Sequence, residues 1–258
     1  MSSIQAMYPI LEFDPERSAI LNPTHFQNNQ PISSKAVLCF FQEVLLAHVT
    51  SGRLKKVGGL NSEMGENPIY ELEQSGQHLT VFHPGVGAPL AAGFLDELIV
   101  GEQVKTVVVC GGCGVLQVHI AAGHPVILTS AVRDEGTSYH YLAPSREVAS
   151  SPRVTAALEA ACLAHGMEYL LGKTWTTDGL YRETPAKRAV RLAEGCSVVE
   201  MEAAAFFAVA QFRGAEIGQI VYGGDLVVPD GWDRRGWNSR LRDRELIFDL
   251  AVEAALSL

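Results

Sequence analysis

The chain has 258 residues, of which 47% are hydrophobic and 19% charged, a balance typical of one large α/β domain with a buried core. Its formal net charge of −9 argues against a nucleic-acid binder, because such a protein usually carries a basic stripe. The first 30 residues lack the basic and apolar segments of a signal peptide, and no apolar run approaches the roughly 20 residues that span a bilayer. We therefore expect a single domain over 1–258, located in the cytoplasm and without a membrane partner.

The five cysteines are scattered along the chain, and only Cys110 and Cys113 form a C-x-x-C pair. Both residues between them are glycines, and no second Cys or His pair lies at the spacing of a zinc site. We therefore expect reduced thiols, no metal and no cofactor.

The predicted elements begin after an irregular, Pro-, Asn- and Ser-rich stretch over 1–34. An apolar helix is predicted over 35–48, and turns with short strands over 51–78. From residue 79 onward, short apolar runs alternate with helical segments, which predicts a mainly parallel sheet with helices on both faces. The strands are predicted at 79–83, 106–110, 126–132, 169–175, 197–199 and 217–222, and the helices at 89–100, 155–165, 200–212 and 240–256.

Two carboxylates flank a methionine in the stretch 198–205, VVEMEAAA, where a predicted strand meets a helix. In one interpretation Glu200 and Glu202 are structural, because the N-terminus of a helix favours negative charge. In the other, a carboxylate binds a cis-diol, since each of its oxygens can accept a hydroxyl proton.

The same stretch resembles V-x-E-M-E-[AS]-A, the signature of the nucleoside phosphorylase and uridine phosphorylase family, without interruption. The resemblance implies that Met201 and Glu202 contact ribose, that Glu202 accepts from the 2′- and 3′-hydroxyls, and that Glu200 supports them. It extends over about residues 8–250. It also implies a three-layer α/β/α sandwich with a mixed, partly barrel-like central sheet, assembled into a homo-oligomer between dimer and hexamer.

A glycine-rich turn is predicted at Gly111, Gly112, Cys113 and Gly114, where backbone N–H groups could cradle an anion. The stretch 109–117 resembles the family's R-x-G-[ST]-[CT]-G-[AG]-[IL]-Q, in which the Arg and the hydroxyl residue hold phosphate. Here Val109 stands in place of the Arg and Gly112 in place of the hydroxyl residue. A valine cannot replace the charge and the donors of a guanidinium.

The N-terminal run 11–17, LEFDPER, resembles the family's phosphate loop L-x-G-D-P-x-R. Arg17 keeps the positive charge, whereas Phe13 replaces the glycine whose backbone approaches the anion. The resemblance therefore implies a phosphate site with one of its two arginines.

Asp225 follows the last predicted strand, where purine-type members of the family hold an Asp that protonates the purine N7. Cleavage of a glycosidic C–N bond leaves negative charge on the base, and a general acid neutralises it. Asp225 is thus the candidate catalytic acid, the alternative being a cap on the following loop. In the stretch 176–184, Leu180 or Tyr181 occupies the place of the residue that stacks on the base.

Two other segments fit the family. Residues 131–141 resemble its R-x-E-G-[TA]-[ST] segment, which lies near the sugar and the subunit interface. His25 is a candidate to reach a neighbouring subunit's ribose 5′-hydroxyl, the alternative being a surface histidine.

The resemblance implies that phosphate attacks C1′ of a nucleoside through an oxocarbenium-like transition state, giving free base and ribose 1-phosphate. A purine-type base is slightly favoured, and phosphate is a co-substrate. Hydrolysis by water is an alternative, with Glu12 as a candidate base, because relatives that use water lack the second phosphate arginine. A nucleoside-binding protein without catalysis is a further alternative.

Overall fold

A computed structural model describes residues 6–26 and 31–258 of the chain, and for residues 25 and 26 only the backbone. Within these residues, eleven strands form one mixed sheet. The strands are β1 (Lys35–Cys39), β2 (Leu54–Ser62), β3 (Gly65–Gln74), β4 (Gln77–Phe82), β5 (Thr106–Val115), β6 (Pro125–Asp134), β7 (Glu147–Ala149), β8 (Leu170–Thr177), β9 (Cys196–Glu200), β10 (Glu216–Val228) and β11 (Gly231–Asp233). The helices are α1 (Gln42–Ser51), α2 (Ala88–Asp96), α3 (Pro152–Ala164), α4 (Pro185–Ala193), α5 (Ala203–Arg213) and α6 (Leu241–Ser257).

Part of the sheet closes on itself. The order of neighbouring strands runs from β10 through β6, β8 and β9 to β5, and β5 also pairs with β10 in parallel register. These strands therefore form a closed barrel, while β1, β4, β3 and β2 extend from β5 as an open wing. The mixed, partly barrel-like sheet is as predicted.

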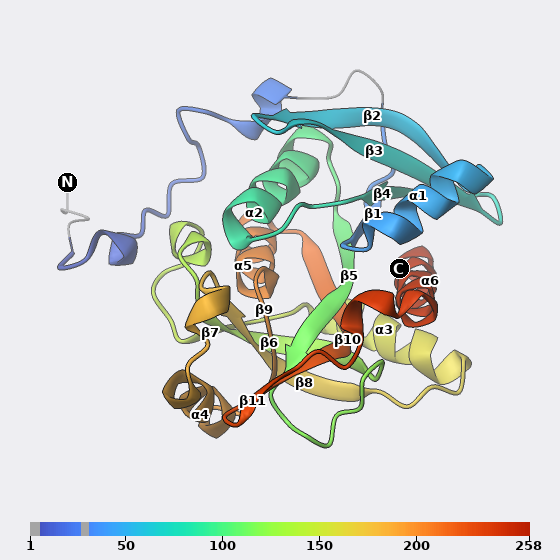
Figure 1. Cartoon of the computed structure of the whole chain (residues 1–258). Coiled ribbons are helices and arrows are strands. Elements are labelled where there is room, and N and C mark those ends of the chain that lie inside the picture. Colours follow the sequence, from blue (N-terminus) through green and yellow to red (C-terminus); the bar gives the residue numbers. More distant parts are fainter. Residues whose placement is uncertain (1–5, 27–30) are drawn as a thin grey trace.

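Helices cover both faces of this sheet (Figure 1). Helices α2 and α5 pack on one face, and α1, α3 and α6 pack on the other. Val107 and Val109 of β5 belong to the hydrophobic cluster that includes α2 and α5. Val108 and Cys110 belong to the cluster on the other face, with α1, α3 and α6. Both faces of β5 are thus buried, which explains its unbroken apolar run and confirms the predicted three-layer α/β/α sandwich.

The stretch 35–48 is not one helix, as the sequence predicted. Lys35–Cys39 forms β1 between β4 and β5, and α1 begins only at Gln42. Because both faces of β1 are buried, its residues do not alternate between apolar and polar, and the pattern that separates a strand from a helix is missing. The stretch 51–78 also differs from its prediction, because it forms the long antiparallel hairpin of β2 and β3.

The glycine run over 111–114 is not a turn either. It continues β5, and its backbone pairs in register with β10, Gly112 lying beside Tyr222. The glycines allow close packing, since a Cβ on Gly112 would lie 3.3 Å from the Tyr222 ring and one on Gly114 2.9 Å from Val199. The predicted cradle of turn amides is therefore replaced by a strand.

The five cysteines are free and buried. Cys110 and Cys113 contribute to the packing on opposite faces of the sheet, because residues three apart on a strand point to opposite sides. The C-x-x-C spacing thus separates the two thiols. No helix of the described residues is long and apolar enough to cross a membrane.

Candidate active site

A cavity of about 880 Å³ lies where the carboxyl ends of β1, β5, β8, β9 and β10 meet. Most of the residues that the sequence singles out line it together: Glu200, Met201, Glu202, Asp225, Leu180, Tyr181, Gly112 and Cys113. Gly111 does not line it, because the position of its missing side chain faces the ring of Phe40, 3.0 Å away.

Two groups of lining residues differ in chemistry. The acidic side has two carboxylates and comes from the loop after β8 and from the ends of β10 and β11; its members are Leu180, Tyr181, Glu183, Asp225 and Trp232. The aromatic side comes from the segment after β1, from β10 and from the region of α6; its members are Phe40, Phe41, Gln219, Tyr222, Trp237 and Arg244.

Glu200 ends β9 and is buried beneath the cavity. Its Oε1 accepts hydrogen bonds from the hydroxyls of Thr176 (2.6 Å) and Thr174 (3.2 Å) on β8. Its Oε2 accepts from the backbone N–H groups of Glu202 (2.8 Å) and Ala203 (2.6 Å). Burial raises the pKa of Glu200, and these bonds oppose the rise. Glu200 therefore holds the β9–α5 junction, the supporting position that the resemblance implies.

Glu202 has a different role, because its side chain caps no backbone group of the helix that it precedes. Instead the N–H of Gly87, in the loop before α2, donates to its Oε1 at 2.6 Å. Burial, and then the negative charge of Glu200, raise the pKa of Glu202 to about 8. A buried carboxylate that is held by one backbone donor and lines a cavity can accept hydroxyl groups from a ligand.

We expect nucleosides to bind more tightly as the pH rises toward about 8. Only the carboxylate form of Glu202 can accept both hydroxyl protons, and burial keeps the empty site partly protonated at neutral pH. Calorimetric titration between about pH 6 and pH 9 should show Kd falling until the pH passes the pKa of Glu202 and then levelling off. In Glu202→Gln this dependence should disappear, and its persistence there would contradict the assignment.

On the acidic side, the Trp232 Nε1–H donates to Asp225 Oδ2. Trp232 lies on β11, which pairs antiparallel to the end of β10 that carries Asp225. Glu183 follows Leu180 and Tyr181 in the loop after β8, and burial together with the charge of Asp225 raises its pKa to about 7. Glu183 and Trp232 were not predicted from the sequence. Glu183 lies within the stretch 176–184, which was singled out for Leu180 and Tyr181. The run Pro229-Asp230-Gly231 before Trp232 is a turn signal from which the β10–β11 hairpin could have been predicted.

On the aromatic side, Arg244 of α6 is the basic residue among those lining the cavity, within the described chain. Its Nε donates to the Tyr222 hydroxyl at 3.1 Å, its Nη2 donates to the Trp237 carbonyl at 3.2 Å, and its Nη1 pairs with Glu43. The rings of Phe41, Tyr222 and Trp237 surround the guanidinium. The positive charge of Arg244 is therefore already balanced by Glu43.

Gln219 is a further lining residue that the sequence analysis missed. It lies on β10 directly beside Val109 of β5, the position where the family pattern has its arginine. Its side chain is 1% exposed, and its Oε1 has no hydrogen-bond partner among the described residues. A buried amide oxygen without a partner is costly, so a group that donates a hydrogen bond would be stabilised there.

Arg17 does not line the cavity. Its segment precedes β1 (Figure 1) and contacts the end of α5. The Arg17 guanidinium lies 5.8 Å from the centre of the Phe212 ring, and its carbonyl accepts from Arg213. Glu12, the candidate base for hydrolysis, accepts from the Ala6 N–H instead of reaching the cavity. The side chain of His25 lies outside the described residues.

The stretch 131–141 also lies outside the cavity lining. The buried Arg133 donates to the hydroxyls of Ser138 and Ser145 and to the carbonyls of Leu142 and Ala143. Its role is to fold the loop that follows β6.

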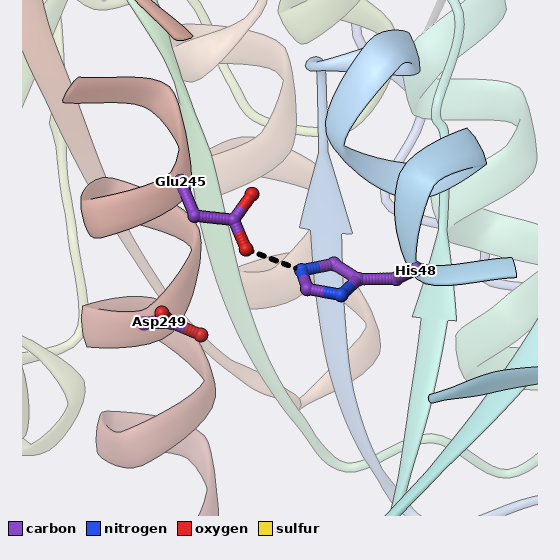
Figure 2. A group of neighbouring side chains, drawn as sticks. All are labelled: His48, Glu245 and Asp249. Atoms are coloured by element: carbon purple, nitrogen blue, oxygen red, sulfur yellow. Dashed lines mark ion pairs between the residues drawn. The ribbon is translucent and has the colours of Figure 1, made fainter. Parts of the chain in front are cut away.

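A second cluster of ionisable groups joins α1 to α6 (Figure 2). The ring Nε2 of His48 lies 2.7 Å from a carboxylate oxygen of Glu245, and Asp249 lies one turn further along α6. The three residues offer ligand atoms within 4.8 Å of one another, as a metal site would. However, Arg53 donates to Asp249 at 2.9 Å and contacts His48 Nε2 at 3.2 Å, so its positive charge already lies there. We interpret the cluster as an ion-pair network that fastens α6 to α1.

Comparisons with known proteins give consistent matches. A sequence profile described as "Phosphorylase superfamily" matches residues 35–247. The chain is 32% identical over 187 residues to a guanosine phosphorylase of Halorubrum lacusprofundi, covering 69% of this chain and 76% of that protein. It is 29% identical over 185 residues to a DeoD-type purine nucleoside phosphorylase of Roseobacter denitrificans, covering 70% and 75%. Among solved structures, an AMP nucleosidase from Bacteroides thetaiotaomicron has the same fold, with a TM-score of 0.70 over 88% of each chain at 23% identity.

Proposed function

Since the chain belongs to the phosphorylase superfamily, we propose that it cleaves the N-glycosidic bond of a nucleoside and transfers the sugar to phosphate, giving free base and ribose 1-phosphate. The observation that carries the proposal is the buried carboxylate of Glu202, which lines the cavity and is held there by the Gly87 N–H. Glu202 and Met201 hold the ribose. A purine-type base is slightly favoured, because Asp225 lines the acidic side and the relatives include guanosine and purine nucleoside phosphorylases.

The chemistry needs three kinds of group. The ribose must be held while C1′ gains positive charge, and the buried anion of Glu202 beside the ring stabilises that charge. The base leaves with the bonding electrons and needs a proton, which the carboxyl groups of the acidic side can supply. A nucleophile must approach C1′ from the face opposite the base, and we place it on the aromatic side.

Hydrolysis is the second candidate, and the aromatic side favours it. A phosphate with one to two negative charges requires cations or several donors in a buried site. Among the described residues that line the cavity, Arg244 is the basic one, and its guanidinium is already paired with Glu43. The free Oε1 of Gln219 suits a water molecule, which can donate a hydrogen bond, better than a phosphate dianion.

Base release from a panel of purine and pyrimidine nucleosides, with and without phosphate, tests the two candidates. We expect release of free base from at least one ribonucleoside. Release that requires phosphate, together with formation of ribose 1-phosphate, would support phosphorolysis, and equal release without phosphate would support hydrolysis. Binding without cleavage would contradict both and would identify a nucleoside-binding protein.

We also propose that the protein acts in nucleoside salvage in the cytoplasm, as a homo-oligomer. The five free thiols suit a reducing compartment. Tyr181 and Val86 line the cavity and are 93% and 66% exposed, so apolar surface surrounds its mouth, which a second copy of the chain would cover.

A further inference from the structure

The acidic side of the cavity holds two carboxyl groups, Glu183 and Asp225. The loop that carries Glu183 joins β8 to α4, and α4 lies beside the β10–β11 end of the sheet (Figure 1). Within the described chain, no hydrogen bond reaches the Glu183 carboxyl group, so its oxygens are available to a ligand. The cavity therefore presents one uncommitted carboxyl group where the proposed function requires contact with the base.

The carboxyl group of Asp225 is already committed. Its Oδ2 accepts a hydrogen bond from Trp232 Nε1, and an indole N–H can only donate. This oxygen must therefore offer a lone pair, so it cannot itself donate a proton to a base. Asp225 instead contributes its negative charge to the acidic side.

Asp225 is the charged group that acts most directly on Glu183, and the basic groups nearby direct their donors to backbone carbonyls. Arg188 of α4 donates to the carbonyls of Val227 and Leu116, and Arg235, after β11, donates to backbone carbonyls near Asp225. Burial first, and then the charge of Asp225, raise the pKa of Glu183 to about 7. A carboxyl group that titrates near neutral pH keeps a transferable proton under working conditions.

We propose that Glu183 is the acid that protonates the departing base, and that Asp225, held by Trp232, is the neighbouring carboxylate beside it. The assignment rests on the proposed function and deepens it. As the C1′–N bond breaks, its electron pair passes to the base, and the Glu183 proton moves to a ring nitrogen of the base. Glu183 is left as a carboxylate, which must regain a proton before the next cycle. Two carboxyl groups whose surroundings drive their proton affinities apart divide the work of acid and anion in this way.

The first test compares substrates that differ in their need for the proton. Glu183→Gln should lower kcat for a nucleoside by about 100-fold or more, the usual contribution of a general acid. It should leave cleavage of p-nitrophenyl β-D-ribofuranoside within about threefold of the wild-type rate, because nitrophenolate leaves without a proton. Equal losses on the two substrates would overturn the acid role.

The second test is the pH profile of kcat at saturating nucleoside, where the bound hydroxyls hold Glu202 as a carboxylate. The wild-type kcat should fall as the pH rises through the pKa of Glu183, because the protonated form is the active one. This limb should be absent in Glu183→Gln and should move to lower pH in Asp225→Asn, which removes the anion that raises the pKa. A merely structural role for Glu183 would leave the limb in place, and that result would overturn the assignment.

Two controls separate the causes of failure. Glu168→Gln, which changes an exposed carboxylate before β8, should behave as wild type in both tests. Thermal unfolding of Glu183→Gln should match wild type, because no hydrogen bond from the described residues to that carboxyl group is lost. A wild-type protein that cleaves neither substrate would contradict the proposed function itself, whereas cleavage of both with an unchanged limb in Glu183→Gln would contradict only this inference.

Discussion

Replacing Glu202 with alanine is expected to lower kcat/KM for a ribonucleoside by about 1,000-fold, the upper range for one preorganised polar group at a reacting centre. The carboxylate would be lost both as the acceptor for the ribose hydroxyls and as the anion nearest to the developing positive charge at C1′. The measurement is the initial rate of base release at subsaturating nucleoside.

The fold should survive this change. Burial near Glu200 raises the pKa of Glu202, so removing its side chain relieves the cost of burying a charge. The change also leaves the Gly87 N–H without its partner. The matched comparison is Glu202→Gln, which keeps the shape of the side chain and removes the charge. Wild-type kcat/KM in either folded variant would contradict the assignment of Glu202 to the ribose.

Replacing Arg244 with alanine should lower the free energy of unfolding by about 3 kcal/mol, because a buried guanidinium with several hydrogen-bond partners and aromatic contacts is lost. The guanidinium pairs with Glu43, donates to the Tyr222 hydroxyl and the Trp237 carbonyl, and packs among three aromatic rings. Its loss would leave these polar groups without a hydrogen-bond partner and would open a cavity among the rings. Urea unfolding followed by tryptophan fluorescence measures the change.

The control for this prediction is on the same helix. Arg242 is exposed, two residues from Arg244, so Arg242→Ala should change the unfolding free energy by less than about 0.5 kcal/mol. Equal unfolding midpoints in Arg242→Ala and Arg244→Ala would show that Arg244 does not stabilise the packing of α6 against Tyr222 and Trp237. A lysine at 244 should not restore stability, because it cannot reproduce the guanidinium's planar set of donors.

The parts of the fold that the sequence predicted well depend on local patterns. The run 106–110 is apolar without alternation because both faces of β5 are buried. The Ala-rich stretch after Glu202 lacks polar residues because residues 203–210 of α5 are all buried. The Glu-Met-Glu segment was identified because its residues are contiguous, so one strand-to-helix junction places all of them at the cavity.

The parts that the sequence did not predict depend on partners far away in the chain. Lys35–Cys39 becomes a strand because β4 and β5 flank it. The run 111–114 remains in a strand because β10 pairs with residues 111–113 and β9 pairs with Gly114. Gln219 matters only because the register of β10 puts it beside Val109. No local pattern contains that register.

The D-P-x-R run shows the limit of a short motif. The residues of 11–17 match a phosphate loop, but they precede β1, whereas the residues directly after β1 are the ones that reach the cavity. These residues after β1 are Phe40 and Phe41. Arg17 lies over the Phe212 ring instead. The place of the segment in the fold therefore decides which residues it contacts, although its sequence matches the motif.

The central claim is that Glu202 holds the ribose of a nucleoside whose glycosidic bond the protein cleaves. The most direct measurement is base release by wild type and Glu202→Ala from a ribonucleoside and from its 2′,3′-dideoxy analogue. The wild type should cleave the ribonucleoside at least about 100-fold faster than the analogue, because the analogue offers the buried carboxylate no hydroxyl donors. In Glu202→Ala the two rates should be nearly equal, since there is no carboxylate left to distinguish the substrates. A preference for the ribonucleoside that is as strong in Glu202→Ala as in wild type would contradict the claim.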